Sequence, residues 1–487
     1  MSDEASIVTG PTWADNSEPE IRRSLPVNAT ALAASPITAW PPGPSSRSFL
    51  MSALAPGVNP ITRFTQMQAR YGNAFAFHVR GRHFTMFIGP DANQYLLATR
   101  AASFAQGASV RLGPVLGKGL LTSEDPLHAT QRRLIQPAFH RGRIEAYQAT
   151  MATETARMLD GWRTGATIDF SAAMHDLTLT IVGRTLFDLD LAQQSSDIGQ
   201  SVNAMIRFLR FRPVSFFTMQ IDLPGFPYRR YLESKAKMDA MIHGLIAERR
   251  AVGTDNGDIL SMLLAARDED GTAMSDTQVR DETLTFLAAG HETTANALGW
   301  TFMLLAQHPA VRQRLVDEIA AVLGDRLPEP ADLARLTYLD CVIKESMRLY
   351  PPAWAGTRIA QEEVELRGYR LPAGTIVGFS QYLTHRMPEH FAEPERFRPE
   401  RFDPDHGEYH PPYAYIPFGA GPRSCIGSGF ALMELKTIVP VILQRFSPDL
   451  APGQRIETEP LVTLRAKRNI LMRIQSSDRT SGNTNAR

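Results

Sequence analysis

The chain has 487 residues, of which 43% are hydrophobic and 21% charged, so it can bury a large core in one large domain or in two to three ordinary ones. Lys and Arg together number 51, as do Asp and Glu, and this balance argues against nucleic acid or an acidic polymer as a partner. The two cysteines, Cys341 and Cys425, exclude a disulfide framework and are typical of a reducing compartment.

Residues 1–36 are polar, acidic and small, and we expect this segment to be disordered. It lacks a basic start followed by a continuous apolar stretch, and no stretch of the chain reaches the roughly 18 to 20 apolar residues that span a bilayer. We therefore predict a cytoplasmic protein without a transmembrane anchor. A single folded domain is expected over 37–475, followed by a polar tail over 476–487.

The folded region starts with strand signals and continues with helices. Apolar residues alternate at period two in 75–79 and again in 84–88 around Gly81, which predicts a hairpin with one buried face. A helical pattern with short breaks covers about 126–350, and Cys341 falls inside it as a packing residue. Strand-like pieces follow around 358–380, and a proline-rich irregular stretch covers 386–417. Helices therefore dominate, with the strands at one side.

The longest predicted helix contains residues that fit a helix poorly. Ser275 and Gln278 form a capping-box start and His308-Pro309 a stop, which gives roughly 30 residues. Ala289-Gly290-His291-Glu292-Thr293-Thr294 lies inside it. A mid-helix glycine costs about 1 kcal/mol relative to alanine, and threonine hydroxyls tend to bond the backbone. Residues that disfavour a helix in the middle of a long one indicate a functional role for this segment.

A glycine-rich run near the C-terminus surrounds the second cysteine. In Phe418-Gly419-Ala420-Gly421-Pro422-Arg423-Ser424-Cys425-Ile426-Gly427, the glycines allow a tight turn that points backbone N–H groups at a sulfur. Such donors favour the thiolate, which is the metal-binding form, and Arg423 can pair with a carboxylate. The run thus predicts a thiolate held against a flat metal cofactor, with a buried structural cysteine as the alternative.

This run resembles the cysteine-loop signature of the cytochrome P450 family, F-G-x-G-x-R-x-C-x-G, at every fixed position. The segment 289–294 is similar to the family's A/G-G-x-D/E-T-T/S motif, and the resemblance covers about 37–475. It implies an α+β, mainly α fold in which haem b lies between a long distal helix and the cysteine loop. Cys425 is implied as the metal ligand, and an axial cysteine thiolate favours O–O cleavage.

The resemblance also implies further residues around the haem. His128-Ala-Thr-Gln-Arg132 is similar to the family's W/H-x-x-x-R, and Arg358 matches an arginine that pairs with a propionate. An ordinary surface side chain is the alternative for each of these three. The full set implied to contact the cofactor is Cys425, Phe418, Arg423, Gly427, His128, Arg132, Arg358, Ala289 and Gly290.

Two residues of the long helix are implied to be catalytic. By resemblance, the helix opens slightly near Gly290, Thr293 donates a hydrogen bond on the oxygen side of the haem, and Glu292 relays protons from solvent. The motif alone selects Thr293 over Thr294, because helical periodicity does not fix the absolute face. The alternative makes Glu292 a solvated helix residue and Thr293 a packed one.

A third motif is implied to be structural. Glu345-x-x-Arg348 lies on a helix ended by Pro351-Pro352, and as a solvated pair it would contribute only about 0.2–0.5 kcal/mol. Downstream, Pro399-Glu400-Arg401-Phe402 resembles the family's P-E-R-F element, whose arginine completes a cluster with such a pair. Glu345, Arg348 and Arg401 are therefore expected to fix the segment that positions the cysteine loop.

The retained acid and alcohol favour a monooxygenase that uses O₂ and two electrons. No redox module is fused, so we expect a monomer that receives electrons from a separate ferredoxin or flavodoxin with its reductase. Arg132, Arg133, Arg141 and Arg143 are a candidate docking patch, or merely a solvated face. A peroxygenase or isomerase of the same fold, or a non-catalytic haem sensor, are the alternatives.

The resemblance places an apolar substrate pocket around residues of several segments, together with parts of 104–116 and 205–219. We expect a hydrophobic substrate such as a fatty acid or terpenoid. The segment 207–217 is basic and aromatic, and it could anchor a carboxylate, contact a membrane or cover the pocket. The named pocket residues are Phe286, Ala289, Trp354, Ala355, Leu461 and Val462.

Overall fold

The structure is a computed structural model, and it describes residues 40–49, 59–79, 82–189, 198–201, 204–205, 208, 227–253, 257–268 and 270–477. The fold set out here belongs to the compact unit Thr38–Arg487. The segment predicted to be disordered, 1–36, lies outside the described residues, as do most of 205–219 and the tail beyond Ser477. No helix of the described part is long and apolar enough to cross a bilayer.

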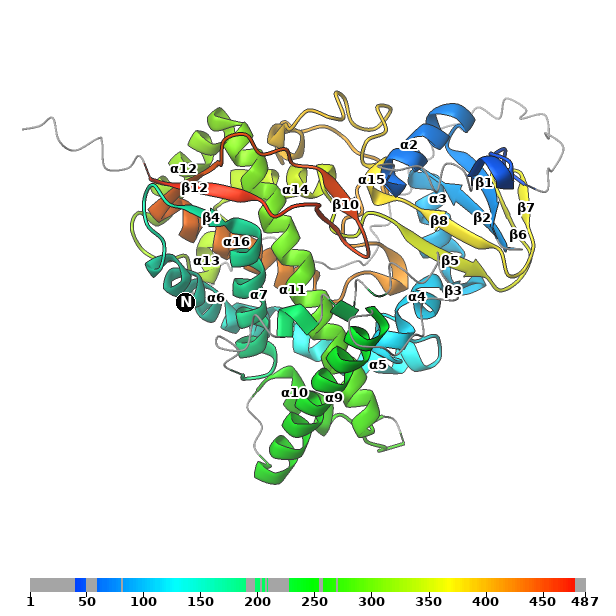
Figure 1. The fold of residues 1–487 in the computed structure, drawn as a ribbon, viewed down its shortest axis with the longest axis horizontal. Helices are drawn as coiled ribbons and strands as arrows, with labels where there is room; N and C mark the ends of the chain where they lie inside the picture. The colour runs from blue at the N-terminus through cyan, green and yellow to red at the C-terminus, as the bar shows by residue number, and fades with distance from the viewer. Residues whose placement is uncertain are drawn as a thin grey trace, which may run out of the picture. The chain divides into compact units, whose positions relative to one another are not determined.

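Helices form most of the described chain (Figure 1). The α-helices are α2 (Pro60–Tyr71), α3 (Pro90–Gln94), α4 (Gly107–Leu116), α5 (Leu127–Ile135), α6 (Arg141–Asp160), α7 (Phe170–Leu186), α9 (Pro227–Val252), α10 (Ile259–Ala265), α11 (Asp276–Gln307), α12 (Pro309–Leu323), α13 (Pro330–Leu333), α14 (Thr337–Leu349), α15 (Gln381–Thr384) and α16 (Ser428–Arg445). A π-helical turn, η1 (Tyr95–Thr99), and the 3₁₀ turns η2 (Ala101–Ser103), η3 (Gln136–Phe139), η4 (Pro399–Phe402) and η5 (Gly421–Arg423) complete them.

The strands form small sheets. They are β1 (Ala74–Val79), β2 (Arg82–Phe87), β3 (Phe104–Gln106), β4 (Thr167–Asp169), β5 (Gly356–Ala360), β6 (Val364–Leu366), β7 (Tyr369–Leu371), β8 (Ile376–Phe379), β9 (Phe446–Leu450), β10 (Thr458–Pro460), β11 (Leu464–Ala466) and β12 (Leu471–Ser476). The largest has the order β1-β2-β8-β5-β3, in which only β2 and β8 run parallel. The others are β4-β12-β9, β6-β7 and β10-β11. The prediction of a helix-rich α+β fold is confirmed.

The predicted N-terminal hairpin is β1 and β2, paired antiparallel with Phe75 opposite Met86 and Phe77 opposite Phe84. Phe75, Met86 and Ile88 are buried in one core cluster, as the alternation predicted. The opposite face is covered too, because Phe87 is buried in a second cluster that includes Leu96 and Phe379. The hairpin is therefore buried on both faces rather than on one, at least around β2.

The long predicted helix is α11, and both of its ends are as expected. Ser275 is the N-cap and exchanges hydrogen bonds with Gln278, while His308 is the C-cap before Pro309. The helix has 32 residues, and it packs against α7, α9, α14 and α16 (Figure 1). It runs without a break through Gly290, so the expected opening of the helix is not seen.

Two buried carboxylates of α11 hold the connection between α4 and α5. Asp281 Oδ2 accepts a hydrogen bond of 2.7 Å from the backbone N–H of Lys118, and Glu282 Oε2 accepts one of 2.9 Å from that of Leu120. A Cβ on Gly117 would lie 2.1 Å from Asp281 Oδ2, so glycine permits this close approach. The connection is thereby tied to the N-terminal half of α11.

Replacing Glu282 with glutamine is expected to reduce the loss of stability that accompanies a rise in pH from about 4.5 to about 8. Burial, with a further contribution from Asp281, raises the pKa of Glu282 from its ordinary value of 4.5 to about 8. The folded state thus keeps a proton that the unfolded state releases, so the carboxyl destabilises the fold increasingly as pH rises from about 4.5 to about 8. Between pH 6 and 7.5 the free energy of unfolding of the wild type should fall by about 2 kcal/mol more than that of Glu282→Gln. Urea unfolding of the two proteins at each pH measures this difference.

The exposed Glu389 provides the matched control, and Glu389→Gln should leave the pH slope of the free energy of unfolding unchanged. Equal slopes in wild type and Glu282→Gln would contradict the expectation.

Candidate active site

The cysteine loop, Phe418–Gly427, precedes α16 and is folded tightly onto η1. Gly419 and Gly421 have φ angles of +70° and +67°, which favour glycine. A Cβ on Gly421 would lie 1.8 Å from the carbonyl oxygen of Leu97 in η1, so no other residue fits there. The backbone N–H of Cys425 donates to the carbonyl of Phe418 at 2.9 Å, which closes the loop.

Cys425 is surrounded by protein and yet accessible. Burial raises the pKa of its thiol, while a hydrogen bond from the backbone of Gly427 and the positive charge of Arg132 oppose that rise. The residue nevertheless keeps an exposed surface. Cys425 thus combines a desolvated environment with an accessible side chain, as a residue in the wall of an enclosed ligand site would. Cys341, by contrast, is buried, and burial raises its pKa to about 11, as expected of a packing residue.

The middle of α11 presents a second accessible surface. Most residues from Val279 to Leu305 are buried, but Ala289 is exposed and Gly290 and Thr293 are half-buried. Ala289 and Thr293 are one turn apart and share a face, whereas Thr294 is 2% exposed and faces the core. The hydroxyl of Thr293 donates to the carbonyl of Ala289 at 2.7 Å.

Glu292 is buried rather than solvated. It is 2% exposed, and its Oε1 accepts a hydrogen bond of 2.7 Å from the hydroxyl of Thr463. Thr463 lies between β10 and β11, 171 residues away in the chain. His291, the variable position of the motif, is also buried, and its Nδ1 lies 2.9 Å from the carbonyl oxygen of Leu287.

Three arginines and His128 gather beside the cysteine loop. The charge of Arg423 lowers the pKa of both Arg358 and His128, after the larger effect of burial, and Arg132 also lowers that of His128. Arg423 donates to the carbonyl of Ser123 at 2.6 Å, and Arg132 to that of Ser424 at 2.9 Å. Arg358 bonds the side chain of Gln106.

Arg358 lies near a second arginine, Arg423. Burial, followed by the charge of Arg423, lowers the pKa of its guanidinium to about 10. Across the described residues it forms no ion pair, and its contacts are the Gln106 side chain, the carbonyl of Thr357 and the ring of Phe379. Arg358 is half-buried, and the charge of Glu124 opposes the lowering of its pKa less strongly than Arg423 promotes it. A desolvated cation without an ion pair fits an anion supplied from elsewhere.

Glu345, Arg348 and Arg401 form a cluster that is closed to solvent. Arg348 bonds both carboxylate oxygens of Glu345, at 2.7 and 2.9 Å, and Arg401 bonds one of them at 3.0 Å. The remaining donors of Arg348 reach the carbonyls of His385 and Pro394. The cluster therefore joins α14 to the irregular segment that precedes the cysteine loop.

His385 extends this connection, and no pattern in the sequence indicated it. Burial and the charge of Arg348 lower the pKa of His385 to about 3, so the ring is neutral. Its Nε2 accepts a hydrogen bond of 2.9 Å from the backbone N–H of Ile416, two residues before Phe418.

The predicted pocket residues divide into two groups. Ala289 is exposed, and Ala355 and Val462 are half-buried, so they present surface to a ligand. Phe286, Trp354 and Leu461 are buried in the core, where the indole N–H of Trp354 donates to the carbonyl of Leu461 at 3.1 Å. Of the segment 205–219, only Met205 and Phe208 are described, and both are buried.

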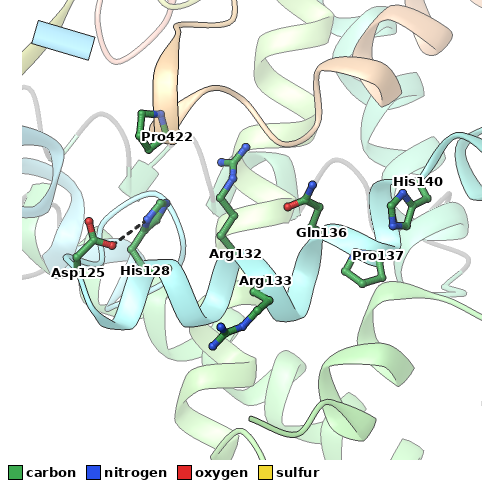
Figure 2. A pocket seen from close by; sticks show the side chains of 9 residues that line it. Asp125, His128, Arg132, Arg133, Gln136, Pro137, His140 and Pro422 are labelled. Atoms are coloured by element: carbon green, nitrogen blue, oxygen red, sulfur yellow. Dashed lines mark ion pairs between the residues drawn. The ribbon is translucent and has the colours of Figure 1, made fainter. Parts of the chain in front are cut away.

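A surface groove of about 550 Å³ lies beside the loop, and Figure 2 shows its lining. Arg132 points toward the backbone that carries Pro422, and Arg133 points away from it. The guanidinium of Arg143 donates a hydrogen bond to the carbonyl of Gly257, and Arg141 forms an ion pair with Glu145 at 2.6 Å. The groove is lined by Asp125, His128, Ala129, Arg132, Arg133, Gln136, Pro137, His140 and Pro422.

Comparisons with known proteins agree on one family. A family model described as Cytochrome P450 matches residues 41–473. The chain is 35% identical over 437 residues to the cyclooctat-9-en-7-ol 5-monooxygenase of Streptomyces melanosporofaciens, covering 89% of this chain and 95% of that protein. It is 34% identical to the pentalenene oxygenase of Streptomyces avermitilis, covering 76% and 82%.

Solved structures show the same fold. The cyanobacterial CYP120A1 with bound retinoic acid superposes with a TM-score of 0.81 at 27% identity, over 90% of this chain and 99% of that one. The cysteine loop, the exposed turn of α11 and the buried glutamate–arginine cluster all lie within the matched residues. The chain therefore belongs to the cytochrome P450 family of haem-thiolate monooxygenases.

Proposed function

We propose that this chain inserts one atom of O₂ into a hydrophobic small molecule of the terpenoid class, with haem b bound by Cys425. The other oxygen atom leaves as water after two electrons and two protons have been supplied. The observation that carries the proposal is the accessible sulfur of Cys425 in a loop that matches the family signature at every fixed position. When bound, the thiolate-ligated haem supplies the activation of O₂.

The residues present fit such a cofactor. Cys425 is accessible although desolvated, and Ala289 and Thr293 are accessible on a helix whose other residues are mostly buried, as the walls of a cofactor site would be. Phe418 and Gly427 flank the sulfur in the loop. Arg132, Arg358 and Arg423 provide cations for the two propionates, and His128 provides a ring N–H. Burial, followed by the charge of Arg423, lowers the pKa of Arg358, although Glu124 and Asp125 lie 3.4 and 3.7 Å from Arg423.

Replacing Arg358 with glutamine is expected to speed haem loss by about tenfold, because a charge-assisted hydrogen bond contributes about 1.5 kcal/mol or more. Haem transfer to apomyoglobin measures the rate. In the haem-free protein the change should not lower the free energy of unfolding, since it removes a desolvated, half-buried cation that forms no ion pair in the described structure.

The surface Arg100, which pairs with Glu362 at 3.1 Å, is the control, and Arg100→Gln should retain haem as wild type does. A haem-free protein destabilised by Arg358→Gln, with haem loss unchanged, would show a purely structural role instead.

We assign proton delivery to Glu292 and Thr293. Glu292 is a buried acid on the helix turn that also carries the accessible Thr293. The hydroxyl of Thr293 can leave the carbonyl of Ala289 and donate a hydrogen bond into the space beside α11. A positioned acid that feeds a hydroxyl is a sensible arrangement for two successive proton transfers.

The proposed substrate class is supported by the relatives and by the described pocket surface. Two relatives are named for terpenoid carbocycles, cyclooctat-9-en-7-ol and pentalenene. The accessible pocket residues Ala289, Ala355 and Val462 are small and apolar, which leaves room for a bulky apolar ring system.

We propose further that the chain acts as a monomer and takes electrons from a ferredoxin or flavodoxin docked beside the cysteine loop. Arg133 and Arg141 are exposed there, and the groove next to Pro422 offers a concave surface. Arg132 and Arg143 are half-buried, whereas Arg133 and Arg141 are exposed, so we assign the electrostatic attraction to Arg133 and Arg141, the second of which also pairs with Glu145.

Incubation of the haem-loaded protein with isotopically labelled O₂ tests the proposal. Spinach ferredoxin, its reductase and NADPH supply electrons, and pentalenene, other cyclic terpenes and long-chain fatty acids serve as probes. We expect a terpene product that carries one labelled oxygen and requires the electron donor. Product formed with hydrogen peroxide alone would indicate a peroxygenase, and an isomerised product without donor or peroxide an isomerase. A labelled product from fatty acids only would overturn the substrate class.

A further inference from the structure

The acid of the α11 motif is held by a side chain from a distant hairpin. The hydroxyl of Thr463 lies 2.7 Å from Glu292 Oε1 and 3.3 Å from Asn296 Nδ2. All three residues are buried. The amide nitrogen of Asn296 can only donate, so the Thr463 oxygen accepts from it and directs its own hydrogen at the carboxylate. The direction of the Thr463 hydroxyl is thereby fixed.

The turn that carries Thr463 is anchored on several sides. The indole N–H of Trp354 donates to the carbonyl of Leu461 at 3.1 Å, and that of Trp300 in α11 donates to the carbonyl of Leu464 at 3.0 Å. The backbone N–H of Leu464 donates to the carbonyl of Pro352 at 2.8 Å. These hydrogen bonds fix the backbone of the turn, so the side chain of Thr463 is preorganised.

Glu292 has no stronger restraint in the described structure. Among the described residues no lysine or arginine forms an ion pair with it, and its Oε2 accepts no hydrogen bond from them. The contact with Thr463 therefore occupies Oε1 and leaves Oε2 as the oxygen that can exchange a proton. The charged and titratable groups near this part of α11 include His291 of α11, His175 and Asp176 of α7, Arg465 of β11, and the buried Glu434 of α16, which faces Thr294.

We infer that Thr463 is a positioning residue for proton delivery: its hydroxyl holds the carboxylate of Glu292 in place. The inference rests on the proposed role of Glu292. Val462, the preceding residue, is a proposed pocket residue, so the same turn contributes both to the pocket wall and to the restraint on the acid.

The test compares Thr463→Val, which keeps the shape but lacks the hydroxyl, with Thr463→Ser, which retains it. The infrared band of the Glu292 carboxyl is identified by subtracting the spectrum of Glu292→Gln from that of wild type, without any turnover. We expect the band to shift in Thr463→Val and to return in Thr463→Ser. Product formed per electron pair should fall about tenfold in the valine variant, with hydrogen peroxide released instead, and recover with serine.

Thr185→Val is the matched control, because among the described residues its buried hydroxyl bonds the carbonyl of Ile181 in its own helix and no other group. This variant should leave the band and the yield unchanged. An unchanged band and yield in Thr463→Val, alongside a reduced yield in Glu292→Gln, would overturn the inference alone. An unchanged yield in Glu292→Gln would overturn the role of Glu292 and with it that of Thr463.

Discussion

Replacing Arg348 with methionine is expected to lower the free energy of unfolding by about 3 to 5 kcal/mol. The side chain is fully buried, and it bonds both carboxylate oxygens of Glu345 together with the carbonyls of His385 and Pro394. Methionine fills part of the volume but leaves a buried carboxylate short of two donors. That uncompensated charge, rather than the lost attraction itself, dominates the effect. Equilibrium unfolding in urea measures it.

The exposed Arg396 is the matched control for this experiment. Its side chain is 64% exposed and pairs with Glu393 at 3.3 Å, so Arg396→Met should cost less than about 1 kcal/mol. A loss below about 1 kcal/mol for Arg348→Met would contradict the account.

The same substitution should loosen the cysteine loop. Arg348 donates a hydrogen bond to the backbone carbonyl of His385, and the neutral ring of His385 accepts a hydrogen bond from the backbone N–H of Ile416. Because Ile416 comes just before Phe418, displacement at His385 reaches the loop through one hydrogen bond. The buried cluster and the proposed metal ligand are therefore mechanically connected.

Replacing Thr293 with alanine is expected to lower product per electron pair by about 10- to 100-fold, while NADPH oxidation continues and hydrogen peroxide accumulates. The magnitude is that of one hydrogen bond to a charged group, about 1.5–3 kcal/mol. Thr293 is half-buried on the accessible face of α11, so its hydroxyl can donate a hydrogen bond to a group bound beside Ala289. Product and peroxide yields measured against NADPH consumed give the result.

Thr294→Val is the neighbouring control. Thr294 is 2% exposed, and its hydroxyl donates to the carbonyl of Gly290 at 3.2 Å, so its loss should affect stability rather than product yield. If Thr294→Val reduced the yield and Thr293→Ala did not, the assignment of the two threonines would be reversed.

Features with a local cause could be predicted from the sequence. The capping box at Ser275 and the proline at 309 set the ends of α11, because both act through neighbouring residues. Alternation at 75–79 and 84–88 predicted the β1–β2 pairing for the same reason. The face of Thr293 needed the structure, since periodicity gives relative angles only.

One contact between distant segments, the cluster of Glu345, Arg348 and Arg401, was implied by the resemblance, but the others could not be predicted. The hydroxyl of Thr463 donates a hydrogen bond to Glu292, which lies 171 residues away in the chain, and the sequence around Thr463 contains no acid-binding pattern. His385 joins the arginine cluster to Ile416 through backbone groups, which carry no residue-type signal. Arg132 and Arg143 looked like free surface cations but bond the carbonyls of Ser424 and Gly257.

The absorption difference spectrum of the dithionite-reduced protein with carbon monoxide tests the central claim most directly, when recorded beside Cys425→Ala. We predict a strongly red-shifted Soret band in wild type that is lost in the variant, since a proximal thiolate is what shifts this band. A band at the position typical of histidine-ligated haem, or a band that persists in Cys425→Ala, would contradict the assignment of Cys425 as the metal ligand.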